Sequence, residues 1–323
     1  MKQIIHRLKN SRRVFLASHV NPDGDAVGSL VAMGAALDAI NIQNTLYNES
    51  PIPAVYRFLP AVERIQQRFD KKMPYDTAVI LDCGNIERIG TAYPSVSKIP
   101  VVINIDHHIT NTRFGHHQLI DQNACATSEL IYRLVKTMSI SFSMDMAMSI
   151  YTGIVTDTGS FRFSNTNSGS FAICNEMVRL GVKPYHVAQH LYGTYSLGRI
   201  KLLNLALDSI EISHNGKLSI MTLTQDMLNE TGTHPEDADG LIHYARRIKD
   251  VKVAALIQEQ QNGHKLQKGS KQHHVSLRSD GSVDVASIAF QFGGGGHPSA
   301  AGFTIDASIA EIKETISNLS ETI

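Results

Sequence analysis

The first half of the chain alternates short apolar runs with segments of helical periodicity. The runs RVFLASH, TAVILDCG and VVINIDHH are nearly continuous in apolar residues, which is typical of central strands in a parallel sheet covered on both faces. DAVGSLVAMGAALDAI predicts a helix after the first run, NTLYN predicts a short strand, and residues 127–191 have a helical pattern. This order predicts an α/β domain, a mostly parallel sheet with helices on both faces.

The pattern changes after about residue 195. SIEISHNGKLSIMTLT predicts a hairpin with Asn-Gly at its turn. VKVAALIQEQ, QHHVSLRS and SAAGFTID predict further strands, and VDVASIAFQF predicts a helix. We therefore expect a first domain over residues 1–192, a linker or hinge helix over 193–205, and a smaller α+β domain over 206–323.

Composition narrows the class of protein. Among the 323 residues, Lys plus Arg equal Asp plus Glu at 30 each, which argues against a protein that coats long nucleic acid by its bulk charge. Apolar runs are far shorter than the roughly 20 residues that span a bilayer. Cys83, Cys125 and Cys174 show no paired spacing, which favours reduced thiols. We expect a cytoplasmic protein with no membrane partner.

Histidine and aspartate stand where three predicted strands end. Since the carboxyl ends of parallel strands meet at one edge of a sheet, these side chains should lie together. Two more aspartates follow in the turn NPDGD, and another stands where a later helix stops. NPDGD alone is more often a solvated turn than a ligand loop, but the joint pattern predicts one site. Its residues are His19, Asp23, Asp25, Asp82, Asp106, His107, His108 and Asp157.

Five carboxylates in one cleft would repel each other unless cations compensate them. The set offers more ligands than one ion needs, and two ions about 3.5–4 Å apart are a recurrent device for phosphate-ester hydrolysis. His19 and Asp23 can face one ion, while the turn at Gly24 lets Asp25 face the other. Carboxylate and imidazole without thiolate favour Mn²⁺. We expect two Mn²⁺ ions, which Co²⁺ or Mg²⁺ could replace.

A second candidate region lies near the end of the chain, in FGGGGHPSAAGF. A glycine-rich turn exposes N–H groups that bind phosphate oxygens, and His297 can add a donor; a flexible linker is the alternative. On the preceding predicted strand, Arg278 shares a face with His274 and Ser276, opposite Val275 and Leu277. Its guanidinium suits phosphate, although a solvated arginine is equally consistent. We expect His273 and His274 to be solvated.

These motifs resemble the DHH phosphoesterase family over nearly the whole chain. HVNPDGDAVGS, LDCGN, IDHH and TDTGSF match its four metal-site motifs in order, and GGGGHPSAAG resembles the signature of the DHH-associated C-terminal domain. The length resembles the stand-alone branch of nanoRNases and pAp phosphatases. The resemblance implies a first metal ion on His19, Asp23 and Asp82. It implies a second on Asp25, Asp82, His107 and Asp157, with Asp82 bridging.

The resemblance also implies roles for the remaining residues. His108 would contact the scissile phosphate, Asp106 would orient a histidine, and an active site would lie in the cleft between the domains. The C-terminal domain would hold a substrate phosphate through Arg278, Gly294, Gly295, Gly296 and His297.

The implied substrates are very short oligoribonucleotides (nanoRNA) and 3′-phosphoadenosine 5′-phosphate (pAp), not long nucleic acid. The sequence leaves open whether the protein forms a homodimer. The alternatives are a phosphodiesterase for linear dinucleotides, a manganese inorganic pyrophosphatase, which GGGGHPSAAG fits poorly, and a nucleotide sensor without catalysis.

Overall fold

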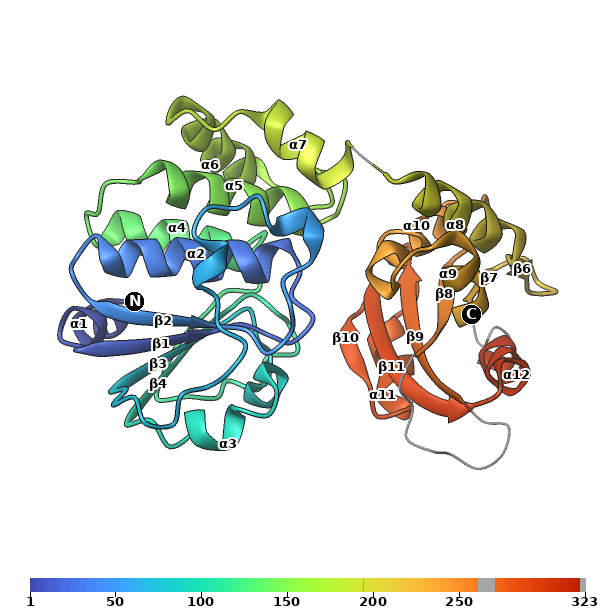
Figure 1. Ribbon diagram of the computed structural model, residues 1–323, viewed down its shortest axis with the longest axis horizontal. Helices are drawn as coiled ribbons and strands as arrows, with labels where there is room; N and C mark the ends of the chain where they lie inside the picture. The colour runs from blue at the N-terminus through green and yellow to red at the C-terminus, as the bar shows by residue number, and fades with distance from the viewer. Residues whose placement is uncertain (194, 261–270, 320–323) are drawn as a thin grey trace. The chain divides into compact units, whose positions relative to one another are not determined.

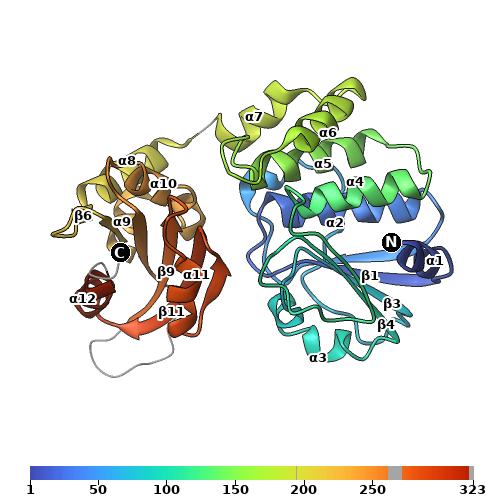
Figure 2. The same cartoon turned by 180° about the vertical axis from the view of Figure 1, so that it is seen from behind.

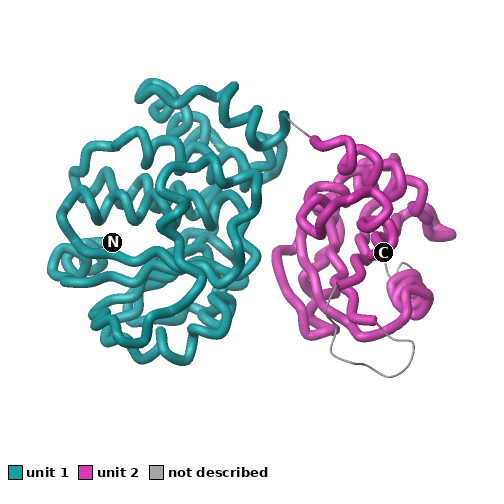
Figure 3. The backbone as a smooth tube through the Cα atoms, viewed as in Figure 1, with its two compact units in different colours: residues 1–193 teal, residues 194–323 magenta. Residues whose placement is uncertain are grey.

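Two sheets organise the chain, each within its own compact unit. The computed structural model describes residues 1–193, 195–260 and 271–319, and it divides into units of residues 1–193 and 194–323 (Figures 1 and 3). Residue 194, within the expected linker, lies outside the described residues.

The sheet of the first unit is wholly parallel, as the continuous apolar runs predict. Its strand order is β2-β1-β3-β4-β5. The chain places β2 on one side of β1 and β3 on the other, so the order in which strands are added changes direction between β1 and β3. Ligands of such open α/β sheets bind at the carboxyl edge beside this reversal. Among the strands of this sheet, only the four-residue edge strand β5 was not predicted from the sequence. The strands are β1 (Arg13–Ala17), β2 (Gln43–Tyr47), β3 (Thr77–Leu81), β4 (Val101–Asp106) and β5 (His117–Ile120).

Long helices cover one face of this sheet (Figure 2). A Cβ added at Gly28 would lie 2.5 Å from the carbonyl oxygen of Ser149, so α2 (Gly24–Asp38) and α5 (Met144–Asp157) pack backbone to backbone. The opposite face carries an aromatic cluster that includes Phe15, Tyr47 and Tyr75, beside the short α3 (Tyr93–Val96). The remaining helices are α1 (Lys2–Lys9), α4 (Thr127–Thr137), α6 (Ser168–Arg179) and α7 (Pro184–Tyr192).

The second unit contains a mixed sheet in the order β10-β11-β9-β8-β7-β6, in which only β7 and β8 pair in parallel. Its strands are β6 (Glu211–Ile212), β7 (Leu218–Leu223), β8 (Val253–Glu259), β9 (Lys271–Ser279), β10 (Gly295–His297) and β11 (Ala300–Ala307). Its helices are α8 (Leu197–Asp208), α9 (Gln225–Thr231), α10 (Ile242–Arg246), α11 (Val285–Gln291) and α12 (Ile309–Leu319).

Apolar cores lie on both faces of this second sheet. The helix expected as a linker is α8, and its Leu202 and Ala206 are buried in one of these cores with residues of β7, β8 and α10. The hairpin expected around Asn215-Gly216 is formed by β6 and β7. The core on the other face is built from β7, β8, β9, β11, α11 and α12.

Strand β9 shows the predicted alternation and also corrects one expectation. Val275 and Leu277 are buried, while Ser276 and Arg278 are partly exposed on the opposite face. The expectation of a solvated His273 is wrong, because the side chain is only 1% exposed. The two-residue period puts it on the buried face with Val275.

In the part of the chain that the structure describes, the helices lack the length and apolar content that crossing a membrane requires.

Candidate metal centre

The loop after β1 carries the first two candidate ligands. Nδ1 of His19 lies 2.9 Å from the carbonyl oxygen of Val20, and because a carbonyl only accepts, Nδ1 carries the hydrogen and Nε2 keeps its lone pair. Asp23 is the N-cap of α2, where its Oδ1 accepts from the N–H groups of Asp25 at 3.1 Å and Ala26 at 3.0 Å. Helix capping therefore fixes the turn that sequence analysis singled out.

Asp82 lies at the centre of the site, directly after β3. Its backbone is left-handed, with φ at +57°, an uncommon conformation for a residue with a side chain and one that clusters at functional sites. Nε2 of His19 lies 3.5 Å from its Oδ2, and Nε2 of His107 lies 3.7 Å from its Oδ1. Its two oxygens thus face two different imidazoles.

Burial and the surrounding imidazoles act on Asp82 in opposite directions. Burial favours the neutral acid, but the neighbouring imidazoles of His19, His108 and His107 outweigh it and lower the pKa of Asp82. The carboxylate is therefore charged when it is buried.

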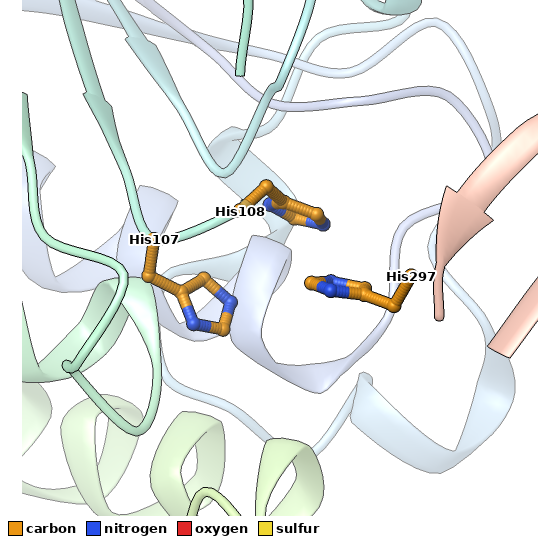
Figure 4. Close-up of side chains that lie close together, drawn as sticks. All are labelled: His107, His108 and His297. Carbon is orange, nitrogen blue, oxygen red and sulfur yellow. The ribbon is translucent and has the colours of Figure 1, made fainter. Parts of the chain in front are cut away.

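His107 connects Asp82 to the end of α5. It projects from the end of β4 beside His108 (Figure 4). Its Nδ1 lies 3.3 Å from the carbonyl oxygen of Ala124, so Nδ1 carries the hydrogen and Nε2 the lone pair. That Nε2 lies 3.6 Å from Oδ2 of Asp157. Asn165 donates to the same oxygen at 3.1 Å. Burial opposes charge on His107, but the nearby carboxylates, Asp157 first, raise its pKa to about 9.

His108 and Asp106 form a hydrogen-bonded pair. Nδ1 of His108 lies 2.6 Å from Oδ1 of Asp106, and Asn111 donates to the other oxygen of Asp106. Burial works against the charge of Asp106, yet its bond to His108 lowers its pKa. Asp106 therefore engages Nδ1 of His108 and fixes the orientation of its ring.

Asp25 is held by the amino-terminal end of α4. Its Oδ2 accepts from the N–H of Thr127 at 2.6 Å, and its Oδ1 accepts from the N–H of Ser128 at 2.9 Å and the hydroxyl of Ser29 at 3.2 Å. Burial, followed by the charge of Asp82, raises the pKa of Asp25 to about 7. Burial likewise raises the pKa of Asp157. A cation at the site would reverse both effects.

The geometry fits divalent cations better than direct ion pairs. Ligand atoms about 2.1 Å from one ion lie roughly 3–3.6 Å from one another, close to the 3.5–3.9 Å that separates the imidazole Nε2 atoms from the carboxylates. Hydrogen bonds of these types would be near 2.8 Å. Three potential ligand groups each include Asp82: His19 with Asp23, Asp25 with His107, and Asp106 with His108. In the third group Nδ1 of His108 is already taken by Asp106, so the first two groups can hold metal.

Several residues that support the site carried no signal in the sequence. The hydroxyl of Thr127 donates to Oδ1 of Asp82 at 2.9 Å, and Asn48 donates to the carbonyl oxygen of His19 at 2.8 Å. Asn165 and Asn111 hold the carboxylates described above. They lie in separate loops and at a helix start, where Asn and Thr are common without any site, so only the folded chain reveals them.

The glycine run of the second unit differs from the expected open turn. Gly293 (φ +74°) and Gly294 donate their N–H groups to Phe290 and Ala289 at 3.0 and 2.9 Å and cap α11. Gly294 therefore has no backbone donor left for a phosphate, which corrects that part of the expectation. Gly295 begins the edge strand β10.

Steric contacts separate the roles of the glycines. A Cβ at Gly294 would lie 2.2 Å from the carbonyl oxygen of Gly302, and one at Gly296 would lie 2.4 Å from that of Ala300. These two glycines allow β11 to approach. A Cβ at Gly295 would meet no described atom within 4 Å, so packing within the described chain does not require glycine there.

Arg278 lies on β9 opposite Ala300 of β11, and its Nη1 donates to the carbonyl oxygen of Leu277 at 2.9 Å. A small residue therefore lies opposite Arg278 on the neighbouring strand. The roles of Arg278, Gly295, Gly296 and His297 in substrate binding stay predictions.

Comparison with known proteins gives one consistent result. Residues 13–154 match the DHH family N-terminal domain, and residues 215–323 match the DHHA1 domain. The chain is 32% identical over 295 residues to the bifunctional oligoribonuclease and PAP phosphatase NrnA of Thermus thermophilus, covering 90% of this chain and 84% of that one. It is 28% identical to the protein of that name from Bacillus subtilis, covering 94% and 92%.

A solved structure extends the similarity to the fold. The crystal structure of an exopolyphosphatase-related protein from Bacteroides fragilis matches 99% of this chain and 95% of its own, with a TM-score of 0.90 and 25% identity.

Proposed function

Because this chain belongs to the DHH phosphoesterase family, we propose that it hydrolyses phosphate esters of very short oligoribonucleotides and of pAp. Support comes from the two relatives of nearly the same extent, whose names give both activities. The single observation that carries the chemistry is Asp82, whose two carboxylate oxygens face the Nε2 atoms of two different histidines.

We assign two Mn²⁺ ions to this site. His19, Asp23 and Asp82 would hold one, and Asp25, Asp82, His107 and Asp157 the other. The absence of thiolate among these donors favours Mn²⁺ over structural zinc. When bound, such ions supply positive charge for the phosphoryl oxygens and lower the pKa of a water so that it can attack phosphorus.

The protein groups around the ions would orient and stabilise the reacting phosphate. His108 donates Nδ1–H to Asp106, and this bond fixes the orientation of the ring. When the ring carries a proton on both nitrogens, Nε2 can donate to a phosphoryl oxygen as negative charge develops. Asn111 in turn holds Asp106. Asp106 is therefore a positioning residue, and His108 would touch the substrate.

Residues of the second unit would bind another phosphate of the substrate. Arg278 offers a planar guanidinium suited to bidentate contact. The Gly295–His297 strand offers backbone and imidazole donors on the same sheet, with β11 between it and the strand of Arg278. With a net charge of zero, the chain has little general attraction for long strands. Recognition of two phosphates by local contacts favours substrates of a few nucleotides.

The test is hydrolysis by purified protein with Mn²⁺. The substrates are pAp, RNA of two to five nucleotides, a linear dinucleotide and pyrophosphate, each with and without chelator. We expect turnover of pAp and short RNA that stops when the metal is chelated. Hydrolysis of pyrophosphate alone, or hydrolysis that survives chelation, would overturn the proposal. Faster turnover of the linear dinucleotide would make it the preferred substrate, and the proposed metal-dependent hydrolysis of phosphate esters would stand.

A further inference from the structure

An open depression in the first unit lies outside the proposed metal and phosphate contacts. Its volume is about 610 Å³, within the range of small-molecule sites. It is built by the loops that follow β1, β2 and β3, at the carboxyl edge of the sheet. We call it the Glu49 depression. It is lined by Val20, Asn21, Glu49, Ser50, Glu87, Gly90, Thr91, Tyr93 and Pro94.

The depression shares a wall with the candidate metal centre. Val20 and Asn21 lie between His19 and Asp23 in the chain, so one loop borders both. Strands β1 and β2 pair in parallel with Ala17 opposite Tyr47, which places His19 and Glu49 two residues beyond that pair. Adjacent strands are about 4.8 Å apart. A nucleotide with its phosphate at the metal centre can therefore extend its sugar toward Glu49.

Two hydrogen bonds, made by the residues before and after Glu49, hold the loop after β2 against the loop after β1. Asn48 donates to the carbonyl oxygen of His19 at 2.8 Å, and the N–H of Asn21 donates to the hydroxyl of Ser50 at 2.8 Å. Glu49 stands between the two residues that make these bonds. The backbone carrying Glu49 is thus tied to the loop that carries His19.

The carboxylate of Glu49 is charged, and hydrogen bonds fix its orientation. Its Oε2 accepts from the N–H of Thr91 at 2.7 Å, from the Thr91 hydroxyl and from the hydroxyl of Tyr47 at 3.1 Å. Partial burial opposes the charge, but these bonds outweigh it and lower the pKa of Glu49. The three bonds all go to Oε2, so Oε1 can accept from a ligand.

The lining selects the neutral part of a nucleotide rather than its phosphate. Glu49 and Glu87 would repel phosphate. Lysine, arginine and histidine are absent from this lining, which consists wholly of residues that the structure describes. Hydroxyl donors fit the carboxylates, and Tyr93, 36% exposed, offers with Pro94 an apolar wall for a base.

We propose that the Glu49 depression is a ribose subsite, in which Glu49 accepts a hydrogen bond from the 2′-hydroxyl of the nucleotide whose phosphate lies at the metal centre. This inference rests on the proposed function and names what would select RNA. In dinucleotide-binding α/β folds, an acidic residue further along the chain from the phosphate-binding turn accepts from a ribose hydroxyl. The 2′-hydroxyl is the group by which a protein can distinguish RNA from DNA.

The test compares ribose and deoxyribose forms of one 5′-phosphorylated diadenylate with Mn²⁺, for the wild-type chain and Glu49→Gln. The amide can still accept from Thr91, but it presents an NH₂ group in place of the second acceptor oxygen. We expect kcat/KM for the ribose substrate to fall about tenfold or more, as loss of a hydrogen bond to a charged group does. The rate on the deoxyribose substrate should change less than about twofold.

Two controls separate this result from a folding defect. Glu63→Gln makes the same change at an exposed glutamate of the same unit and should leave both rates unchanged. A 2′-fluoro diadenylate tests the wild-type chain without any mutation, because fluorine cannot donate. We expect it to react as slowly as the deoxyribose form.

Equal rates for the ribose and 2′-fluoro substrates, or an equal loss on both sugars in Glu49→Gln, would overturn the ribose subsite while leaving the proposed function intact. A wild-type chain that hydrolyses neither sugar form, nor pAp, would instead overturn the proposed function.

Discussion

Replacing Thr127 by valine should weaken metal binding without changing the shape of the core. Thr127 is fully buried at the start of α4. Its hydroxyl donates to Oδ1 of Asp82 at 2.9 Å and its N–H donates to Oδ2 of Asp25 at 2.6 Å. Valine removes the first bond and keeps the second. Loss of a group that orients a metal ligand costs about 10–100-fold in affinity, or roughly 1.4–2.8 kcal/mol.

The assay is calorimetric titration of Mn²⁺ into metal-free protein, with Thr152→Val as the matched control. Thr152 is also fully buried in the first unit, but its hydroxyl has no hydrogen-bond partner among the described residues. We expect Thr152→Val to bind Mn²⁺ like the wild type and to be at least as stable. If Thr127→Val also binds Mn²⁺ like the wild type, the hydroxyl does not orient Asp82, and the reasoning about this bond is wrong.

Three further predictions concern the substrate. Gly295→Ala should keep the melting temperature within a few degrees yet raise KM for short RNA, because a bound phosphate would need the space at Gly295 that packing leaves empty. Gly294→Ala should lower the melting temperature, because its methyl group would clash with β11. If thermal unfolding showed Gly295→Ala to be the less stable variant, the assigned roles would be contradicted. Arg278→Ala should raise KM and lower kcat/KM with Mn²⁺ affinity unchanged; an unaltered KM would remove Arg278 from the site. In a length series of labelled RNA, a dinucleotide should react much faster than a strand of about thirty residues, and equal rates would refute recognition by two local phosphate contacts.

Much of the metal centre could be predicted because its residues follow strands whose apolar character is unmistakable. RVFLASH and VVINIDHH place His19 and His107 at strand ends, and parallel strands deliver their carboxyl ends to one edge. The structure brings these residues and Asp25, Asp82 and Asp157 together within a few ångströms. The left-handed backbone of Asp82 could not be predicted, because it depends on the fold around it.

The supporting residues could not be predicted, because they act across long stretches of chain. Thr127 reaches Asp82 from 45 residues away, and no local pattern distinguishes it from an ordinary residue in the first turn of a helix. The packing role of the glycine run could not be predicted for a related reason. Gly294 and Gly296 are required by the approach of β11, a tertiary contact that looks the same in sequence as a phosphate-binding turn. Strands as short as β5 and β10 also lack enough residues to show a period.

The most direct test of the account is the number of Mn²⁺ ions bound per chain, measured by equilibrium titration of the metal-free wild type and of Asp82→Asn. The bridging position of Asp82 between His19 and His107 predicts two ions in the wild type. It predicts fewer than two in Asp82→Asn, with hydrolysis of short RNA lost, because the substitution removes charge from both ions at once. A wild type that binds a single ion, or an Asp82→Asn variant that binds two and turns over normally, would contradict the account.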